Sequence, residues 1–439
     1  GIAVFGDNSL GWRVAPAVAG TLLVAVTYFI ALRLFRRRGL AALTAFLLAI
    51  EGLALTMSRI SMLDIFLALF VAVGVWCLLI DRDRRWAAVT ATDDGAAGAW
   101  TDDAVTDGGV AGAWTDDAVT DDGAAGARTD DAVTDDGPPR ARRLPHVTRS
   151  YRWLAGLALA LALATKWSGV LAIAAAGRFL LASELAWRRA ATGRWWRQPW
   201  RLIGGGLASL VLVPLVLYVG SYVSWFANYE YTRPGVATCG DEGQICEVGP
   251  DDIVRGWFGE QQEIFRFHRD LEVTHNYRAS ALNWPITRRP VVYYYESCSE
   301  ESDEPCAVER GNIEEIIGLG NPVVWWVALP LYPLLLWAAI ARRDRVAATI
   351  AVLLLAQYVP WLVQARPLFF FYALPLVPMV VLTLAWAADQ ALPHRMLRWF
   401  PVGVATAALG AFIYWVPLYY GFQVTENAWR MRMLLNSWI

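Results

Sequence analysis

The sequence is short of charge, and its positive charge is almost entirely arginine. Only 18% of the 439 residues are charged, and Lys166 is the single lysine among 38 basic residues. The formal net charge of −2 gives no general basic field, so no nucleic-acid partner is expected. Hydrophobic residues make up 56% of the chain, above the roughly 45–50% of soluble domains. The composition therefore predicts a protein that lies in a lipid bilayer.

The common signatures of soluble enzymes are also missing. The sequence has no Walker loop, no GxGxxG after a strand, no HExxH and no GxSxG. Two of the four histidines, His268 and His275, lie seven residues apart without a third ligand at metal-binding spacing. We predict no metal and no cofactor, and expect the two histidines to hydrogen-bond a sugar or a loop carbonyl.

Cysteine is scarce, and four of the five cysteines lie in one polar segment. Cys239 and Cys246 form one close pair and Cys298 and Cys306 another, whereas Cys77 lies in an apolar run. If the segment faces an oxidising compartment, the spacing predicts two local disulfides. The alternative is four free thiols.

Long apolar runs dominate the rest of the chain. A bilayer core needs roughly 20 apolar residues per helix, and ten runs are candidates. They cover 14–34, 40–58, 62–80, 153–167, 169–187, 202–223, 319–341, 346–364, 368–388 and 400–420. Arginines collect in alternate loops, for example after the first, third and seventh runs, which makes that side cytoplasmic by the positive-inside rule.

This alternation divides the chain into six parts. Residues 92–150 hold an acidic 14-residue repeat that cannot bury a core, so we expect a flexible cytoplasmic insertion and linker. The aromatic-rich segment 224–318 is expected to fold outside the cytoplasm on the membrane surface. The remaining parts are three spans in 1–91, three in 151–223, four in 319–420, and an extracytoplasmic tail at 421–439.

A few ionisable residues occur where lipid disfavours them. Three of them, Arg59, Lys166 and Arg366, lie at three separate external turns. These cations could converge on one anion, such as a phosphate whose attached lipid chain stays in the bilayer. There are two alternatives to anion binding. Arg59 and Asp64 could form a local ion pair, and the Lys166 side chain could simply extend its ammonium group to the membrane boundary. Glu51 lies inside the second run, and we favour a structural role for it.

Several motifs in their order resemble the protein O-mannosyltransferase family, in its actinobacterial form within the GT-C class of membrane glycosyltransferases. The motifs are Gly11-Trp12-Arg13, Glu51-Gly52-Leu53, Ser58-Arg59-Ile60, Ala164-Thr165-Lys166-Trp167, Phe267-His268, His275-Asn276-Tyr277, Arg289-Pro290, Gly320-Asn321-Pro322, Pro360-Trp361 and Asn436-Ser437-Trp438-Ile439. The resemblance implies an all-α GT-C-like helix bundle with about ten spans and one large external loop.

The resemblance also implies the reaction. Mannose would pass, with inversion, from polyprenyl-phosphate mannose to Ser/Thr hydroxyls of secreted proteins at the outer face of the cell membrane. Arg59 matches an arginine important to the family, and Lys166 and Arg366 match motif positions suited to the donor phosphate. Asp64, Glu51, His268 and His275 would support the site. The general base, an Asp in an Asp-Glu pair, has no match here and is expected upstream of Gly1, which would leave this chain without normal turnover.

Two other functions remain open. A related transferase could use the same lipid-linked sugar to modify a glycolipid or polysaccharide, and a transporter would need ionisable groups near mid-membrane on broken helices. The charges collect at one boundary, which favours chemistry there. The expected partners are the lipid donor, secreted acceptor proteins and, as an option, the secretion translocon.

Overall fold

In a computed structural model, the structure describes residues 1–93, 147–196, 198–240, 248–299 and 306–439. Of the insertion and linker expected at 92–150, residues 94–146 lie outside these ranges. The pairing expected for Cys239 and Cys246 also falls outside what is described. By contrast, Cys298 and Cys306 form the expected disulfide, and Cys77 is a buried free thiol.

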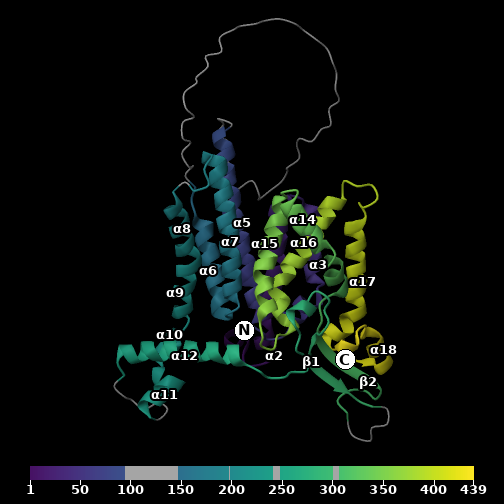
Figure 1. Cartoon of the computed structure of the whole chain (residues 1–439). Helices are drawn as coiled ribbons and strands as arrows, with labels where there is room; N and C mark the ends of the chain where they lie inside the picture. Colours follow the sequence, from purple (N-terminus) through teal and green to yellow (C-terminus); the bar gives the residue numbers. More distant parts are fainter. Residues whose placement is uncertain (94–146, 197, 241–247, 300–305) are drawn as a thin grey trace, which may run out of the picture. The chain divides into compact units, whose positions relative to one another are not determined.

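Helices make up most of the described chain (Figure 1). The first half contains α1 (Ile2–Phe5), α2 (Ser9–Phe35), α3 (Arg38–Ala49), α4 (Gly52–Met57), α5 (Asp64–Asp93), α6 (Ser150–Thr165), α7 (Gly169–Thr192), α8 (Pro199–Leu207), η2 (Ala208–Leu212) and α9 (Val213–Gly220). The last part contains α13 (Pro322–Ala328), α14 (Leu331–Ile340), α15 (Arg345–Tyr358), η5 (Val359–Val363), η6 (Phe370–Leu376), α16 (Val377–Ala391) and α17 (Phe400–Tyr420).

Seven of the described helices are long and apolar enough to cross a membrane, or eight if α13 and α14, bent by 43°, form one span. The helical class is therefore confirmed, whereas the count of ten spans is not. α3 and α6 are only 12 and 16 residues long. The second expected run breaks because the Glu51 carboxylate caps α4, accepting from the Ala54 N–H at 2.7 Å.

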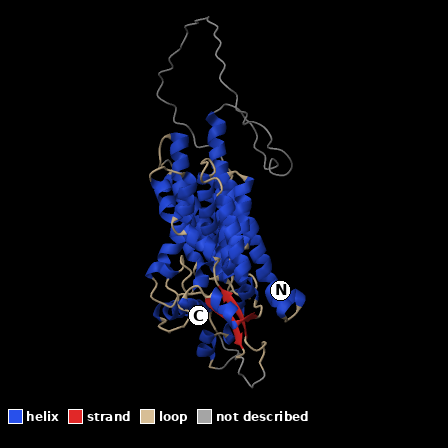
Figure 2. Cartoon of the chain, turned by 90° about the vertical axis from the view of Figure 1, so that its right-hand side faces the viewer, coloured by secondary structure: helices blue, strands red, loops and turns tan. Residues whose placement is uncertain are grey.

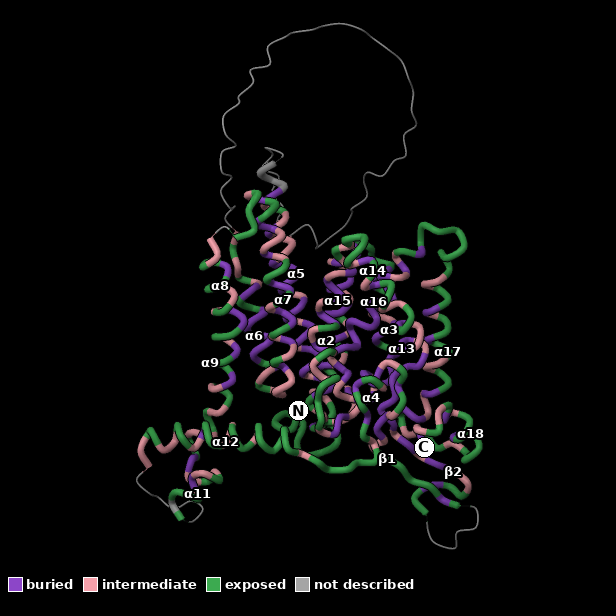
Figure 3. Tube along the Cα trace, viewed as in Figure 1, coloured by how far each residue is buried: buried purple, intermediate pink, exposed green. Residues whose placement is uncertain are grey.

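The chain forms two compact units. The first comprises residues 1–82, 149–184 and 198–439 and holds the main core, in which α16 belongs to the most enclosed candidate membrane span and α17 presents much of its surface outward (Figure 3). The second comprises residues 83–148 and 185–197. Its described part has a small core of Val89, Trp187 and Ala191, and the Trp187 indole donates to the Arg85 carbonyl at 2.6 Å.

The segment between α9 and α13 folds at one end of the first unit, as expected for a structured loop (Figure 1). It contains α10 (Val223–Ala227), η3 (Tyr229–Tyr231), α11 (Arg233–Cys239), α12 (Pro250–Asp270), η4 (Ala281–Asn283), β1 (Val291–Ser297) and β2 (Asn312–Gly318). The tail adds β3 (Val424–Thr425), α18 (Glu426–Arg432) and η7 (Asn436–Trp438). α12 lies across the ends of the upright helices.

A small antiparallel sheet at this end was not predicted. Its order is β1-β2-β3, and it lies beside the C-terminus (Figure 2). The alternating burial of Ile313, Glu315 and Ile317 on β2 has the two-residue period of a strand with one covered face. The tail closes over the same region, because the Trp438 indole donates to the Thr287 carbonyl at 2.8 Å.

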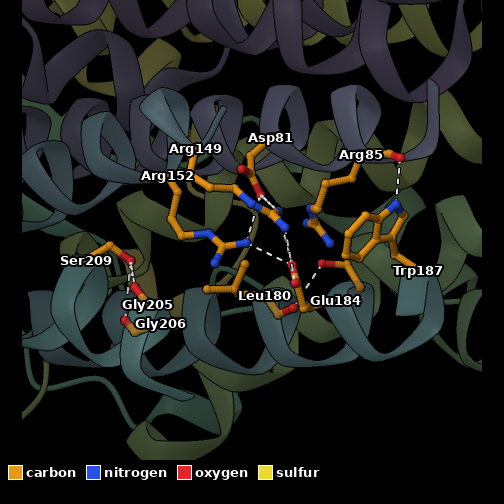
Figure 4. A network of polar contacts seen from close by, with 11 residues as sticks. Asp81, Arg85, Arg149, Arg152, Leu180, Glu184, Trp187, Gly205, Gly206 and Ser209 are labelled. Carbon is orange, nitrogen blue, oxygen red and sulfur yellow. Dashed lines mark hydrogen bonds and ion pairs between the residues drawn. The ribbon is translucent and has the colours of Figure 1, made fainter. Parts of the chain in front are cut away.

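Four charged side chains join the helices α5, α6 and α7 inside the first unit (Figure 4). Arg152 lies 3.3 Å from the Asp81 carboxylate and 2.8 Å from that of Glu184. Arg149 approaches Glu184 to 3.3 Å. Asp81 and Glu184 are both about 1% exposed. This buried ion network was not predicted from the sequence, although Asp81 and Glu184 are acids at the ends of apolar runs.

We expect the free energy of unfolding to fall as pH rises, because of a buried carboxyl group on β2. Glu315 is buried, and desolvation raises the pKa of its carboxyl to about 7, although the Trp429 indole donates to it. The folded state therefore keeps a proton that the unfolded state releases above the ordinary pKa of 4.5. The free energy of unfolding should fall by about 2 kcal/mol between pH 4.5 and 7. Thermal unfolding measured across this pH range tests the prediction. Glu315→Gln should flatten the dependence of stability on pH, and an unchanged dependence in this variant would contradict the role of Glu315.

Candidate functional site

Lys166 and Asp64 form the centre of a charged cluster, which the last turn of α12 also reaches through His268. Asp64 begins α5, and Lys166 lies in the turn between α6 and α7. The Lys166 Nζ lies 2.8 Å from the Asp64 carboxylate, which is only 2% exposed. Asp64 therefore pairs with Lys166 and not with Arg59, so the alternative of a local Arg59–Asp64 ion pair is wrong.

A tight helical turn places Lys166. The Gly169 N–H donates to the Lys166 carbonyl at 2.8 Å, and α7 begins immediately. A Cβ atom on Gly169 would lie 2.7 Å from the backbone of Ala162, so a larger residue would force the two helices apart. The sequence Lys166-Trp167-Ser168-Gly169 thus encodes both the turn and the position of its cation.

A second cation reaches the same cluster from the other half of the chain. Arg366 lies between η5 and η6, where the following Pro367 favours an extended backbone. The ring of Tyr372 lies 4.1 Å from the Lys166 Nζ and 5.4 Å from the Arg366 Cζ, both measured to its centroid. Both cations therefore contact one aromatic ring, and two of the three cations expected to converge do so.

His268 completes this cluster from the last turn of α12. Its Nδ1 lies 2.8 Å from the Arg366 Nη1. Because a guanidinium can only donate, Nδ1 accepts and His268 is neutral. Burial lowers the pKa of His268, and the positive charges of Arg366 and Lys166 lower it further. The neutral ring carries its proton on Nε2, where it can donate to a ligand.

The cluster has a net charge suited to a monoanion. Burial lowers the pKa of Lys166, and the Asp64 carboxylate opposes this shift. With both cations charged, Asp64 ionised and His268 neutral, the four groups sum to one positive charge. Lys166 has three N–H donors and Arg366 has five, so both can bind a ligand while keeping their present partners.

Arg59 has other partners. Its Nη1 donates to the Tyr419 carbonyl at 2.5 Å, and its Cζ lies 4.1 Å from the centroid of the Tyr420 ring, at the end of α17. The structure therefore does not bring Arg59 into contact with Tyr372 or Asp64. Its contacts tie the turn after α4 to α17.

We expect Arg59→Ala to lower stability by about 1–2 kcal/mol, because a hydrogen bond from a charged donor and a stacked ring contact are lost. The measurement is thermal or denaturant unfolding in detergent. Arg266→Ala, at an exposed position on α12, is the control and should change stability little. Equal unfolding midpoints for the two variants would contradict the anchoring role.

Glu51 and His275 serve the local fold. Glu51 is fully buried, and its Oε1 accepts from the Asn321 N–H and the Trp325 indole, each at 3.0 Å. This agrees with the structural role favoured from the sequence. The His275 Nδ1 accepts from the Tyr277 N–H at 3.1 Å, which is a loop amide and not the expected carbonyl. Within the described residues, no three His, Cys, Asp or Glu side chains gather as metal ligands.

Sequence reasoning missed Tyr372, which is the ring that both cations share. It belongs to the run Phe369-Phe370-Phe371-Tyr372, which reads as part of an apolar span. Its position could have indicated it, because the run begins two residues after Pro367, at a predicted membrane boundary where tyrosine often lies.

Known structures share this fold. The yeast (S. cerevisiae) structure "protein O-mannosyltransferase Pmt1-Pmt2 complex bound to the sugar donor" matches 98% of this chain and 81% of its own, with a TM-score of 0.70 and 12% sequence identity. The upright helices and the helical and sheet elements at one end thus define a membrane glycosyltransferase fold of the GT-C class.

The sequence comparisons identify the family. "Dolichyl-phosphate-mannose-protein mannosyltransferase" matches residues 2–88, and "C-terminal four TMM region of protein-O-mannosyltransferase" matches residues 253–438. Proteins named polyprenol-phosphate-mannose--protein mannosyltransferase are similar over 99% of this chain and about four-fifths of their own length. They are 29% identical in Corynebacterium glutamicum and 26% in Mycolicibacterium smegmatis. This chain belongs to the protein O-mannosyltransferase family.

Proposed function

We propose that the protein transfers mannose, with inversion, from polyprenyl-phosphate mannose to Ser/Thr hydroxyls of secreted proteins at the extracytoplasmic face of the cell membrane. The Lys166–Arg366 pair on Tyr372 is the observation that carries the proposal. A phosphodiester donor has one negative charge, which the net positive charge of the cluster complements. The names of the similar bacterial proteins support the same donor class and a protein acceptor.

The arrangement favours departure of the sugar. As the bond from the anomeric carbon to the phosphate oxygen breaks, negative charge grows on the phosphate. Two fixed cations stabilise this charge more than they stabilise the ground state, and they therefore lower the barrier. The His268 Nε2–H is available as a third donor. We propose Lys166 and Arg366 as phosphate ligands, Asp64 and Tyr372 as the groups that hold them, and Arg59 as an anchor of the neighbouring turn.

The acceptor hydroxyl must lose its proton to a base. Asp64 is paired with Lys166 and does not match the family's catalytic motif, so we assign it no proton-transfer role. The Asp-Glu pair that supplies the base in the family has no match in this sequence, so we name no residue of this chain as the general base.

A transfer assay tests the proposal. Membranes containing the full-length gene product should move radiolabelled mannose from polyprenyl-phosphate mannose to a Ser/Thr peptide, but not to the same peptide with alanine at those positions. Label found only in a glycolipid or polysaccharide would favour the related transferase. Substrate flux in sealed vesicles without any mannosylated product would favour transport.

A further inference from the structure

The hydroxyl group of Tyr218, on α9, joins two segments that contribute to the charged cluster. Its oxygen accepts from the Trp167 indole N–H at 2.7 Å, and its own proton is donated to the Gln261 Oε1 at 2.6 Å. The Tyr222 hydroxyl lies 3.0 Å away and donates to Tyr218, because the Tyr218 proton is already used. Three hydrogen bonds thus fix the position of the Tyr218 hydroxyl.

The first of these bonds leads to Lys166. Trp167 directly follows Lys166 in the tight turn between α6 and α7. The bond from its indole to Tyr218 therefore ties this turn to α9 and limits the movement of the Lys166 backbone. Tyr218 is only 9% exposed, so water has little access to replace the bond if it is lost.

The second bond leads to Arg366 through α12, which lies across the end of α9 (Figure 1). Gln261 and His268 are seven residues apart, and this spacing places them on the same face of α12, about 10 Å apart along its axis. Gln261 binds Tyr218, and two turns later the His268 Nδ1 binds the Arg366 Nη1. The helix therefore carries the position of Tyr218 to the second cation.

These contacts form a closed circuit within the first unit. They run from the Lys166 turn through Tyr218 and α12 to Arg366. The Tyr372 ring, which contacts both cations, closes the circuit. Because the circuit is closed, each link limits the movement of the groups on either side of it. Tyr218 is the link between the turn and the helix.

We propose that Tyr218 is a positioning residue for the candidate site, and the catalytic part of this inference rests on the proposed function. Its hydroxyl holds α12 against the turn that carries Lys166. The neutral His268 ring then stays beside Arg366, with its Nε2–H available to the donor phosphate. Tyr218 acts only through Trp167 and Gln261, and we assign it no contact with the reacting atoms.

The ionisation of His268 reports on the position of α12 without any need for activity. Burial lowers the pKa of His268, and the positive charges of Arg366 and Lys166 lower it further. If α12 loosens, the ring gains water and moves away from both cations, so its pKa should rise toward the ordinary value of 6.5. The measurement is a pH titration of the histidine NMR signals of the whole chain in detergent, with His268→Gln used to assign the signal.

Three variants test the link. Tyr218→Phe removes the hydroxyl and keeps the ring, and we expect the pKa of His268 to rise. Tyr222→Phe is the matched control, because it removes a hydroxyl of the same group that joins neither Trp167 nor Gln261 in the described chain, and the pKa should not change. Gln261→Met breaks the link from the other side and should raise the pKa as Tyr218→Phe does. The double variant should then show no further shift.

Two results would overturn the proposal. One is an unchanged pKa of His268 in Tyr218→Phe. The other is an equal rise in Tyr218→Phe and Tyr222→Phe, which would indicate a general disturbance of the two stacked tyrosines. If Tyr218→Phe does not fold, Gln261→Met decides, because a raised pKa in that variant supports the link and an unchanged one contradicts it.

The transfer assay separates this inference from the proposed function. In the full-length protein, Tyr218→Phe should lower kcat about tenfold, the equivalent of one hydrogen bond. KM should change little, because both cations remain to bind the donor, and Tyr222→Phe should transfer at the wild-type rate. No transfer by the wild type would remove the proposed function but leave the His268 titration as evidence for the link. A normal kcat in Tyr218→Phe, despite a raised pKa, would overturn the positioning role.

Discussion

Lys166→Gln should lower the rate of mannosyl transfer by about 10²–10³-fold, the usual loss when one preorganised donor to a developing anion is removed. The glutamine keeps a similar length and loses the charge. It also leaves the buried Asp64 carboxylate without its ammonium partner, so the local charge changes from +1 to zero. Because the lost interaction grows as the phosphate departs, kcat should fall more than KM rises.

Two controls make this result specific. Arg342→Gln removes a positive charge outside the cluster, where Arg342 contacts the Trp337 ring at 4.4 Å, and transfer should be unchanged. Tyr372→Phe keeps the aromatic face beneath both cations and should retain most of the activity, whereas Tyr372→Leu should not. Wild-type transfer by Lys166→Gln, in membranes with normal protein levels, would remove the proposed phosphate site.

Asp81→Asn should lower the free energy of unfolding by about 1.5–3 kcal/mol, because the buried Arg152 loses one of its two anionic partners and keeps Glu184. Asparagine has nearly the same shape, so the loss reports charge and not volume. Thermal or denaturant unfolding in detergent measures it. We expect correspondingly less folded protein in membranes.

An exposed pair provides the matched control for this change. Asp251 and Arg255 lie 3.0 Å apart one turn along α12, and both side chains are more than half exposed. Asp251→Asn should therefore cost at most about 1 kcal/mol, because water already screens the pair. Equal losses for Asp81→Asn and Asp251→Asn would show that the ion network does not hold these helices together.

Hydrophobic periodicity, charge and cysteine spacing were enough to predict a membrane helix bundle and the Cys298–Cys306 bond. They were less able to predict where spans break. An apolar run in the sequence does not show that the Glu51 carboxylate caps the next helix. The position of this carboxylate depends on its hydrogen bonds with Asn321 and Trp325, about 270 residues away. The three strands were missed for a similar reason, because β3 comes from the tail more than a hundred residues after β2.

The candidate site shows the same division. Lone cations at membrane boundaries were visible in the sequence, and two of them, Lys166 and Arg366, proved to share a ring. The ring itself was not visible, because Tyr372 is one aromatic residue among many, and only folding gives it a special position. Arg59 carried the same sequence signal as Lys166, yet its contacts lie with the end of α17. The pattern of charges in the sequence does not distinguish a proposed phosphate ligand, such as Lys166, from a residue that holds a turn in place, such as Arg59.

The hydrogen bond between Arg366 and His268 sets an acid limit on this part of the protein. It requires a ring nitrogen without a proton, so an imidazolium at that position would face a guanidinium with like charge. Since the pKa of His268 is already lowered, the neutral ring persists below the pH at which a free histidine would ionise. Under stronger acidification the final turn of α12 would be repelled from the loop that carries Arg366, and contact between these two segments would loosen first.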